Sequence, residues 1–185
     1  GGGTTDIAII SLGGIVVSES QRIAGNTLDN EIVRFVRNRS NLLIGDRTAE
    51  EIKRTVGAAL LLPDDEDELM EVRGRDLIDG MPKTATISTS QVVEAISASL
   101  DKLGAAACRV LEQAPPELIS DVIERGIVMT GGGSQLKNID VFLQRATGVP
   151  VTVAEDPADC VVIGTSRALE MSSVLHDASV ELRRG

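Results

Sequence analysis

Aromatic side chains are almost missing from this sequence, which has two Phe and no Trp or Tyr among 185 residues. Because 42% of the residues are hydrophobic, the chain can still bury a core, but Ile, Val, Leu and Ala must pack it. Cysteine is equally scarce. Cys108 and Cys160 match no metal-ligand spacing, so we expect two reduced, buried thiols, as in a cytosolic protein, and no metal site.

Basic residues are too few for a protein that binds nucleic acid. Against 28 Asp and Glu stand 18 Lys and Arg, which gives a net charge of -10. Nucleic-acid binding needs clustered Lys and Arg to neutralise phosphates, so we expect no nucleic-acid partner. No run of 18 apolar residues is present to span a membrane. The sequence begins Gly1-Gly2-Gly3 without an initiator Met, and we expect it to be a piece of a longer protein.

The hydrophobic patterns predict a mixed α/β chain. Apolar runs predict strands at 5–10, 15–23, 69–72, 84–87, 127–129 and 149–153, with the strand at 127–129 buried. Periodic stripes predict helices that begin at Asn26, Thr48 and Ser88, a short helix after Pro115-Pro116, and helices at 136–146 and 160–170. Thr48 with Glu51, and Ser88 with Gln91, have the spacing of capping boxes. The acidic run 64–68 is most simply a solvated loop.

Two glycine triplets adjoin predicted strands. Gly1-Gly2-Gly3-Thr4-Thr5 leads into the first strand, and Thr130-Gly131-Gly132-Gly133-Ser134 joins the strand at 127–129 to a helix. Glycine lets backbone N–H groups approach an anion closely, and a helix start adds partial positive charge at the second triplet. Thr4 and Thr5 offer hydroxyls suited to a terminal phosphate or its water shell. One triplet alone would more readily be a tight turn, but two together favour phosphate binding.

A third candidate lies on the helix predicted from Thr48. Glu50, Lys53 and Gly57 share one face of that helix, because they are spaced at i, i+3 and i+7. Glu50 could accept hydrogen bonds from ribose hydroxyls, Lys53 could lie against adenine or donate to the sugar, and Gly57 would leave room. The alternative is an exposed Glu50–Lys53 pair with no ligand, which stabilises a helix by a few tenths of a kcal/mol.

Taken together, these segments resemble the superfamily of actins, chaperone ATPases and sugar kinases, and within it the MreB family of bacterial actins. GGGTTDIAIISLGGIVVS is similar to the second phosphate loop and its hairpin, and GDRTAEEIKRTVG to the helix that contacts ribose and adenine. VRGRDLIDGMPKT resembles the MreB outer-lobe hairpin, and GIVMTGGGSQLKNID the adenosine motif. AEDPADCVVIGTSRALE is similar to the segment that returns to the first domain. The resemblance covers nearly the whole chain.

The resemblance implies a fold and a division into parts. The fold would be a ribonuclease-H-like (actin-like ATPase) domain with an inserted small α+β outer lobe. Residues 1–24 and 89–157 would form the inner lobe, and residues 25–88 the outer lobe. Residues 158–185 would return the chain to a first domain that these residues do not include.

The resemblance also implies a site for ATP with Mg2+. Gly1, Gly2, Gly3 and Thr4 would contact the phosphates, Glu50 and Lys53 the nucleoside, and Gly131, Gly132, Gly133 and Ser134 the adenosine side. Thr4 would be the catalytic position, because its hydroxyl would help to hold the attacking water. The family's first phosphate loop and its water-orienting acid lie outside this sequence. We therefore expect slow ATP hydrolysis by a full-length protein and an inactive fragment.

The implied role is that of a cytoskeletal protein that controls cell shape. The family forms homopolymeric double filaments in the cytoplasm, at the inner face of the cell membrane. Its implied partners are further copies of itself, cell-wall elongation proteins, membrane-anchored morphogenesis proteins and the membrane surface, the last through the first domain. The alternative is a sugar kinase or a chaperone ATPase of the same superfamily. A sugar kinase needs a substrate-binding acid and specificity loops that we do not find in the sequence.

Overall fold

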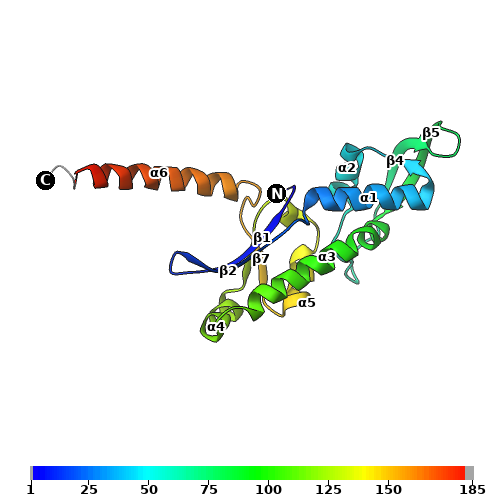
Figure 1. The fold of residues 1–185 in the computed structure, drawn as a ribbon. Coiled ribbons are helices and arrows are strands. Elements are labelled where there is room, and N and C mark those ends of the chain that lie inside the picture. Colours follow the sequence, from blue (N-terminus) through cyan, green and yellow to red (C-terminus); the bar gives the residue numbers. More distant parts are fainter. Residues whose placement is uncertain (1, 182–185) are drawn as a thin grey trace.

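The structure is a computed structural model that describes residues 2–181, with side chains up to Met171. Strands and helices alternate along the chain, which confirms the α/β class (Figure 1). The first two strands, β1 (Thr5–Ser11) and β2 (Gly14–Gln21), form an antiparallel hairpin. Its two-residue turn places Leu12 at φ 50° and Gly13 at φ 77°. Positive φ at both positions is the geometry of a type I′ turn, which suits the twist of paired strands.

The next segment packs two helices on a small sheet. The helices are α1 (Gly25–Ser40) and α2 (Asp46–Val56). The antiparallel sheet has the order β3-β4-β5, with β3 at Leu42–Leu43, β4 at Leu69–Asp76 and β5 at Pro82–Ser88. Gly74 lies inside β4, where its missing side chain lets the backbone of Leu43 approach closely.

The long helix α3 (Thr89–Glu112) packs against elements that come before it and after it in the sequence. It packs against α1, α2 and β5 near its start, and against β1, β2 and α5 (Figure 1). The predicted capping box is confirmed, since the Ser88 hydroxyl accepts from the Gln91 N–H and the Gln91 side chain accepts from the Ser88 N–H. Helix α3 therefore holds the segments before it, from β1 to β5, against α5, which comes after it.

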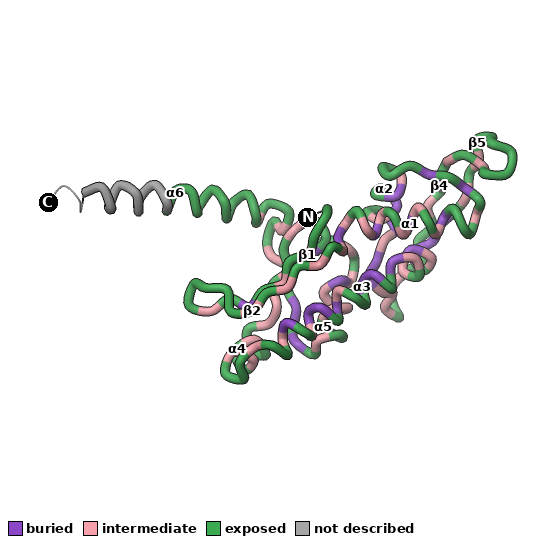
Figure 2. The backbone as a smooth tube through the Cα atoms, viewed as in Figure 1, coloured by how far each residue is buried: buried purple, intermediate pink, exposed green. Residues whose placement is uncertain are grey.

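The core is aliphatic, as the sequence predicts. Its buried members come mainly from α1, α2 and α3, and Figure 2 marks the buried residues in purple. Ile32, Ile52, Val92 and Ile96 are completely buried. The cluster continues to Ile139 of α5. The division into an inner and an outer lobe stays a prediction.

The chain after α3 contains a pair of parallel strands. Helix α4 (Pro116–Arg125) follows Pro115-Pro116, as predicted, and Gly126 comes directly after its last residue. Strand β6 (Ile127–Met129) then pairs in parallel with β7 (Val151–Val153). The prediction that β6 is buried is wrong, because Val128 is 63% exposed. A 3-10 turn, η1 (Gly132–Gln135), and helix α5 (Ile139–Thr147) connect the two strands.

Three predicted helix starts need correction. Helix α1 begins at Gly25 rather than at an Asn26 cap, and α2 begins at Asp46 behind Gly45, so the Thr48–Glu51 capping box does not exist. Asp46 suits the first turn because negative charge is favourable near the positive end of the helix dipole. The helix predicted from Leu136 starts only at Ile139, since Asn138 has φ 60° and interrupts it.

The last helix, α6 (Cys160–Glu181), projects away from the rest of the chain (Figure 1). Its described apolar side chains are exposed, among them Val161, Val162, Leu169 and Met171. Within the described part of the chain, no helix combines the length and apolar character needed to cross a membrane. Cys108 and Cys160 are free thiols, but both are partly exposed, so the prediction that they are buried is wrong.

Candidate functional site

The first glycine loop lies against the start of α1. The Asn26 N–H donates a hydrogen bond of 2.9 Å to the Gly2 carbonyl oxygen. A Cβ atom on Gly2 would lie 2.8 Å from the side-chain oxygen of Asn26, whereas one on Gly3 would have nothing within 4 Å. Helix α1 therefore constrains Gly2, and Gly3 faces open space. Gly1 lies outside the described residues.

The side chain of Lys53, on α2, also lies at the start of α1. Its Nζ atom donates to the Gly25 carbonyl oxygen at 3.2 Å and lies 2.7 Å from Oδ1 of Asp29. The contact with Asp29 is an ion pair rather than an aligned hydrogen bond. Both side chains are largely enclosed, with 16% of Lys53 and 14% of Asp29 exposed. A Cβ on Gly25 would lie 3.4 Å from this Nζ and 3.8 Å from the Gly2 Cα. The structure thus brings Lys53 beside the Gly2 loop.

Glu50 does not pair with Lys53. Its carboxylate lies 3.9 Å from the Arg54 guanidinium on the exposed side of α2. The alternative of an exposed Glu50–Lys53 pair is therefore wrong. Gly57 ends α2, where an added Cβ would overlap the carbonyl oxygen of Lys53. The helix terminus itself therefore requires glycine at position 57.

The second glycine loop forms a tight turn. Gly131 has φ 85°, a conformation that favours glycine. The Ser134 hydroxyl and N–H both donate to the Gly131 carbonyl oxygen, at 2.7 and 3.1 Å, and only 4% of Ser134 is exposed. Ser134 therefore closes the turn. Gly132 and Gly133 would each have nothing within 4 Å of an added Cβ.

The sequence predicts that an α-helix begins at this triplet, but the structure has no α-helix start there. The residues after Gly131 form the 3-10 turn η1, and α5 begins several residues later at Ile139. An α-helix dipole therefore does not point at the triplet. Anion contacts here would have to come from the backbone N–H groups of the turn.

Helix α2 connects the two loops. Just after it, Ala58 forms a parallel bridge with Lys137, and the Ala59 N–H donates to the Lys137 carbonyl oxygen at 2.8 Å. Lys137 follows the Gly131–Ser134 turn in the sequence. The chain just after α2 thus contacts Lys137, which follows the second loop, and Lys53 contacts Gly25, which lies beside Gly2 of the first loop.

The two threonines after the first triplet differ in their contacts. The Thr4 side chain is exposed, and its hydroxyl lies 3.4 Å from Oδ2 of Asp6. The Thr5 hydroxyl donates to the Ile23 carbonyl oxygen at 2.7 Å and so holds the hairpin to the segment before α1. Thr5 serves the fold, and Thr4 is the threonine placed at the surface of the loop.

Sequence reasoning missed Asp29, the ion partner of Lys53. Asp29 lies one turn after Gly25 on α1. A carboxylate at this spacing is common on helices, and its partner is 24 positions away, so no sequence pattern identifies it. In the described residues, no group of three or more His, Cys, Asp or Glu side chains could hold a metal ion.

The roles of the glycine loops and Lys53 stay predictions, whereas the family of the chain follows from its similarity to known proteins. Residues 1–177 match the MreB/Mbl protein family. The chain belongs to the MreB/Mbl family. Because the match spans almost all of the sequence, the sugar-kinase and chaperone alternatives are not favoured.

Curated relatives of the MreB/Mbl family are similar over most of the chain. The cell shape-determining protein MreB of Escherichia coli strain K12 is 48% identical over 171 residues, which are 92% of this chain and 49% of that protein. The cell shape-determining protein Mbl of Bacillus subtilis is 47% identical over 170 residues, or 92% of this chain and 50% of that protein. The chain spans about half the length of these relatives.

Solved structures confirm the actin-like fold. MreB5 of Spiroplasma citri bound to AMPPNP superposes with a TM-score of 0.90 at 35% identity, over 96% of this chain and 53% of that one. A MamK double helical filament has a TM-score of 0.69 at 24% identity, over 85% of this chain and 48% of that one, and supports the fold alone.

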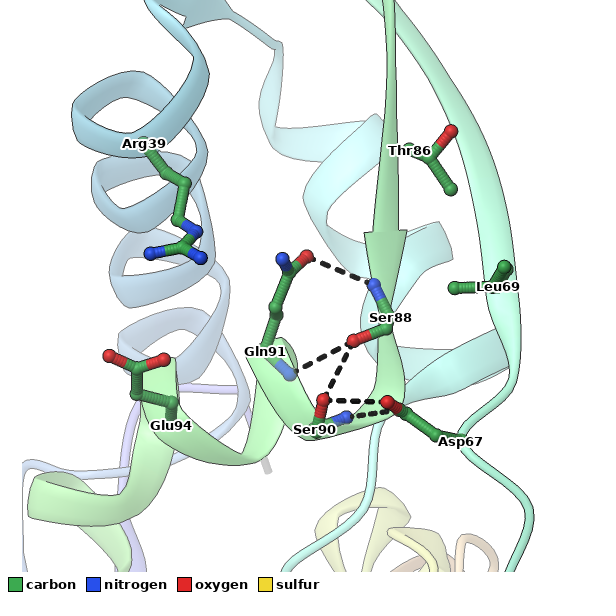
Figure 3. A pocket seen from close by; sticks show the side chains of 8 residues that line it. All are labelled: Arg39, Asp67, Leu69, Thr86, Ser88, Ser90, Gln91 and Glu94. Carbon is green, nitrogen blue, oxygen red and sulfur yellow. Dashed lines mark hydrogen bonds between the residues drawn. The ribbon is translucent and has the colours of Figure 1, made fainter.

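A separate depression of about 570 Å3 opens where α1, α3 and the β4-β5 sheet meet in this MreB/Mbl chain (Figure 3). None of the predicted site residues lines it. At its floor, the Asp67 carboxylate accepts hydrogen bonds from the N–H and the hydroxyl of Ser90, at 2.7 and 2.8 Å. These bonds hold the pKa of Asp67 below its usual value. Asp67 therefore fastens the chain before β4 to the start of α3.

Proposed function

We propose that this chain forms one side of the ATP site of an MreB-type bacterial actin, which assembles into filaments that control cell shape. The observation that carries the proposal is the approach of the Gly2–Gly3 loop to Lys53 at the start of α1, in a chain of the MreB/Mbl family. Crystals of the related MreB5 hold AMPPNP and ADP, which supports a nucleotide as the ligand.

The first glycine loop would contact the phosphates. Gly3 has open space beside its Cα, so its backbone can approach an anion without a side chain in the way. Asp29 would repel phosphate if it were alone, but the Lys53 ammonium at 2.7 Å neutralises it. In this proposal the Thr4 hydroxyl holds the water that attacks the terminal phosphate, through its position rather than as a base.

The nucleoside would lie between α2 and the second glycine loop. Gly132 and Gly133 leave open space, and Glu50 is accessible on α2 for the ribose hydroxyls. Because Lys53 is bound to Asp29 and to the Gly25 carbonyl, it would offer the nucleoside its aliphatic stem rather than a free charge. Ser134 would contribute by closing the turn.

Mg2+ would accompany the phosphates. The described residues offer no cluster of three ligands for it, so phosphate oxygens and water would supply most of its coordination. Slow ATP hydrolysis belongs to the whole protein in this proposal. Contacts with the membrane, with cell-wall elongation proteins and with membrane-anchored morphogenesis proteins also belong to it, at the inner, cytoplasmic face of the membrane.

Electron microscopy of the full-length protein that carries these residues tests the proposal. We expect double filaments in ATP with Mg2+ and none after the nucleotide is removed with apyrase. A Gly3→Val variant should lose filaments, whereas a Gly45→Ala variant is a matched control, because its glycine also has nothing within 4 Å of an added Cβ. Filaments that form equally well without nucleotide, or in Gly3→Val, would contradict the proposed site.

A further inference from the structure

Asp65 joins two segments that are far apart in the sequence. Its Oδ1 lies 3.0 Å from the Lys137 ammonium, and its Oδ2 accepts 2.7 Å from the Asn138 side-chain amide and 2.8 Å from the Leu62 N–H. Only 16% of the Asp65 side chain is exposed, although it belongs to an acidic run expected to be solvated. One carboxylate thus binds three donors from both segments.

Backbone contacts extend the same junction. The Asn138 amide also donates to the Leu60 carbonyl oxygen at 3.0 Å, and the Ala59 N–H donates to Lys137. Asn138 has a left-handed backbone, which asparagine adopts more readily than most residues, and this conformation turns its amide toward Leu60 and Asp65. We call the contacts of Asp65 with Lys137 and Asn138 the Asp65 latch.

The latch lies between the two parts of the proposed nucleoside site. Residues 58–65 follow α2, which carries Glu50 and Lys53, and residues 137–138 follow the Gly131–Ser134 turn. Ala59 and Ile139, on either side of the junction, are buried in the core, and Leu136 is partly buried and packs against it. The gap between α2 and the turn is therefore set by this core packing together with the polar contacts of Asp65, and only the polar contacts can be removed without unpacking the core.

We propose that Asp65 is a positioning residue, which fixes the distance between α2 and the Gly131–Ser134 turn and so determines how tightly the nucleoside is held. This inference rests on the proposed function, because it assigns a role in ATP binding to a residue outside the ATP site. Without the latch, the turn still forms through Ser134 and the Ala58–Lys137 bridge remains, but the side-chain bonds that help to fix the distance between the turn and α2 are lost.

The chain offers a matched control. Glu66 is exposed and adjacent to Asp65, so Glu66→Gln removes the same charge without touching the latch. Asp65→Asn keeps the shape of the side chain but loses the ion pair with Lys137, and Lys137→Met loses it from the other side. If the two residues act through one contact, the double variant should bind ATP no more weakly than either single variant.

The test measures ATP affinity and latch opening separately in the full-length protein. Without nucleotide, hydrogen exchange at the Ala59 amide should become faster in Asp65→Asn and stay unchanged in Glu66→Gln. Affinity for a fluorescent ATP analogue should fall about tenfold in Asp65→Asn, the size expected for a lost charged hydrogen bond, while the melting temperature changes little. The single variant Lys137→Arg should bind the analogue as tightly as the parent, because arginine can keep the ion pair with Asp65.

Each result separates the two proposals. A parental protein that binds no ATP overturns the proposed function, whatever the latch does. If the parent binds ATP, faster Ala59 exchange in Asp65→Asn with unchanged affinity overturns the positioning role. Additive losses in the double variant would also overturn it, because they would show that Asp65 and Lys137 act through different contacts.

Discussion

Replacing Gly132 with Val in the full-length protein should impair ATP binding far more than folding. An added Cβ at Gly132 has nothing within 4 Å, and its φ is not positive. The cost to folding is then limited to the stiffness of a β-branched residue in a short turn, about 0.5–1 kcal/mol. For a domain of this size such a change lowers the melting temperature by no more than about 4 °C.

The loss with nucleotide should be larger, because the Val side chain occupies the open space beside the turn. At an ATP concentration of about 100 times Kd, binding stabilises the parent by about 2.7 kcal/mol. A tenfold weaker Kd reduces this to about 1.4 kcal/mol, and a hundredfold weaker Kd to about 0.4 kcal/mol. Thermal melts of parent and variant, with and without ATP, measure both quantities in one series.

Gly131 provides the contrasting variant. Its φ of 85° strains any side chain, so Gly131→Ala should lower the free energy of unfolding by about 1–3 kcal/mol even without ATP. If Gly132→Val melts like the parent and gains as much stability from ATP as the parent does, the triplet is only a turn. The assignment of this loop to the nucleotide would then be wrong.

Three further changes test the surroundings of the site. Asp29→Ala leaves the enclosed Lys53 ammonium without its carboxylate, so it should lower the free energy of unfolding in urea by about 3 kcal/mol. If the loss is smaller than that from replacing a surface Asp by Ala, the ion pair does not stabilise the fold. Gly57→Ala should cost more than about 1 kcal/mol without nucleotide, because its Cβ overlaps the Lys53 carbonyl oxygen, and a normal melt would contradict this geometry. The lowered pKa of Asp67 stabilises the fold above the pKa of an unfolded Asp, and this stability is lost as pH falls through the lowered value. Asp67→Asn should therefore flatten the acid side of the stability profile, and an unchanged profile would show that the bonds to Ser90 do not act on folding.

The sequence predicts those elements whose signals are local. Ser88 and Gln91 cap α3 because all the groups of a capping box lie within one turn. Pro116 and Gly126 bound α4 because proline and glycine act through their own backbones. The same spacing failed at Thr48, because Gly45 and Asp46 begin the helix earlier and leave Thr48 inside it.

The rest depended on contacts between distant segments. Lys53 was predicted from its helix face, but its partner Asp29 comes from α1. The acidic run 64–68 was interpreted as solvated, although Asp65 binds Lys137 and Asn138, 72 and 73 positions later. A single carboxylate has no periodicity, so its partners appear only once the chain is folded. The glycine triplets could be recognised, but the short 3-10 turn after Gly131 could not.

Hydrogen exchange of the full-length protein with and without AMPPNP tests the central claim most directly. We predict slower exchange in two stretches when the analogue binds, at residues 2–5 and at Gly132 and Gly133, since their backbone N–H groups would contact the nucleotide. The α4 helix should exchange equally in both states and serves as the internal reference. Tight binding of AMPPNP with no protection in either glycine loop would contradict the claim that this chain forms one side of the ATP site.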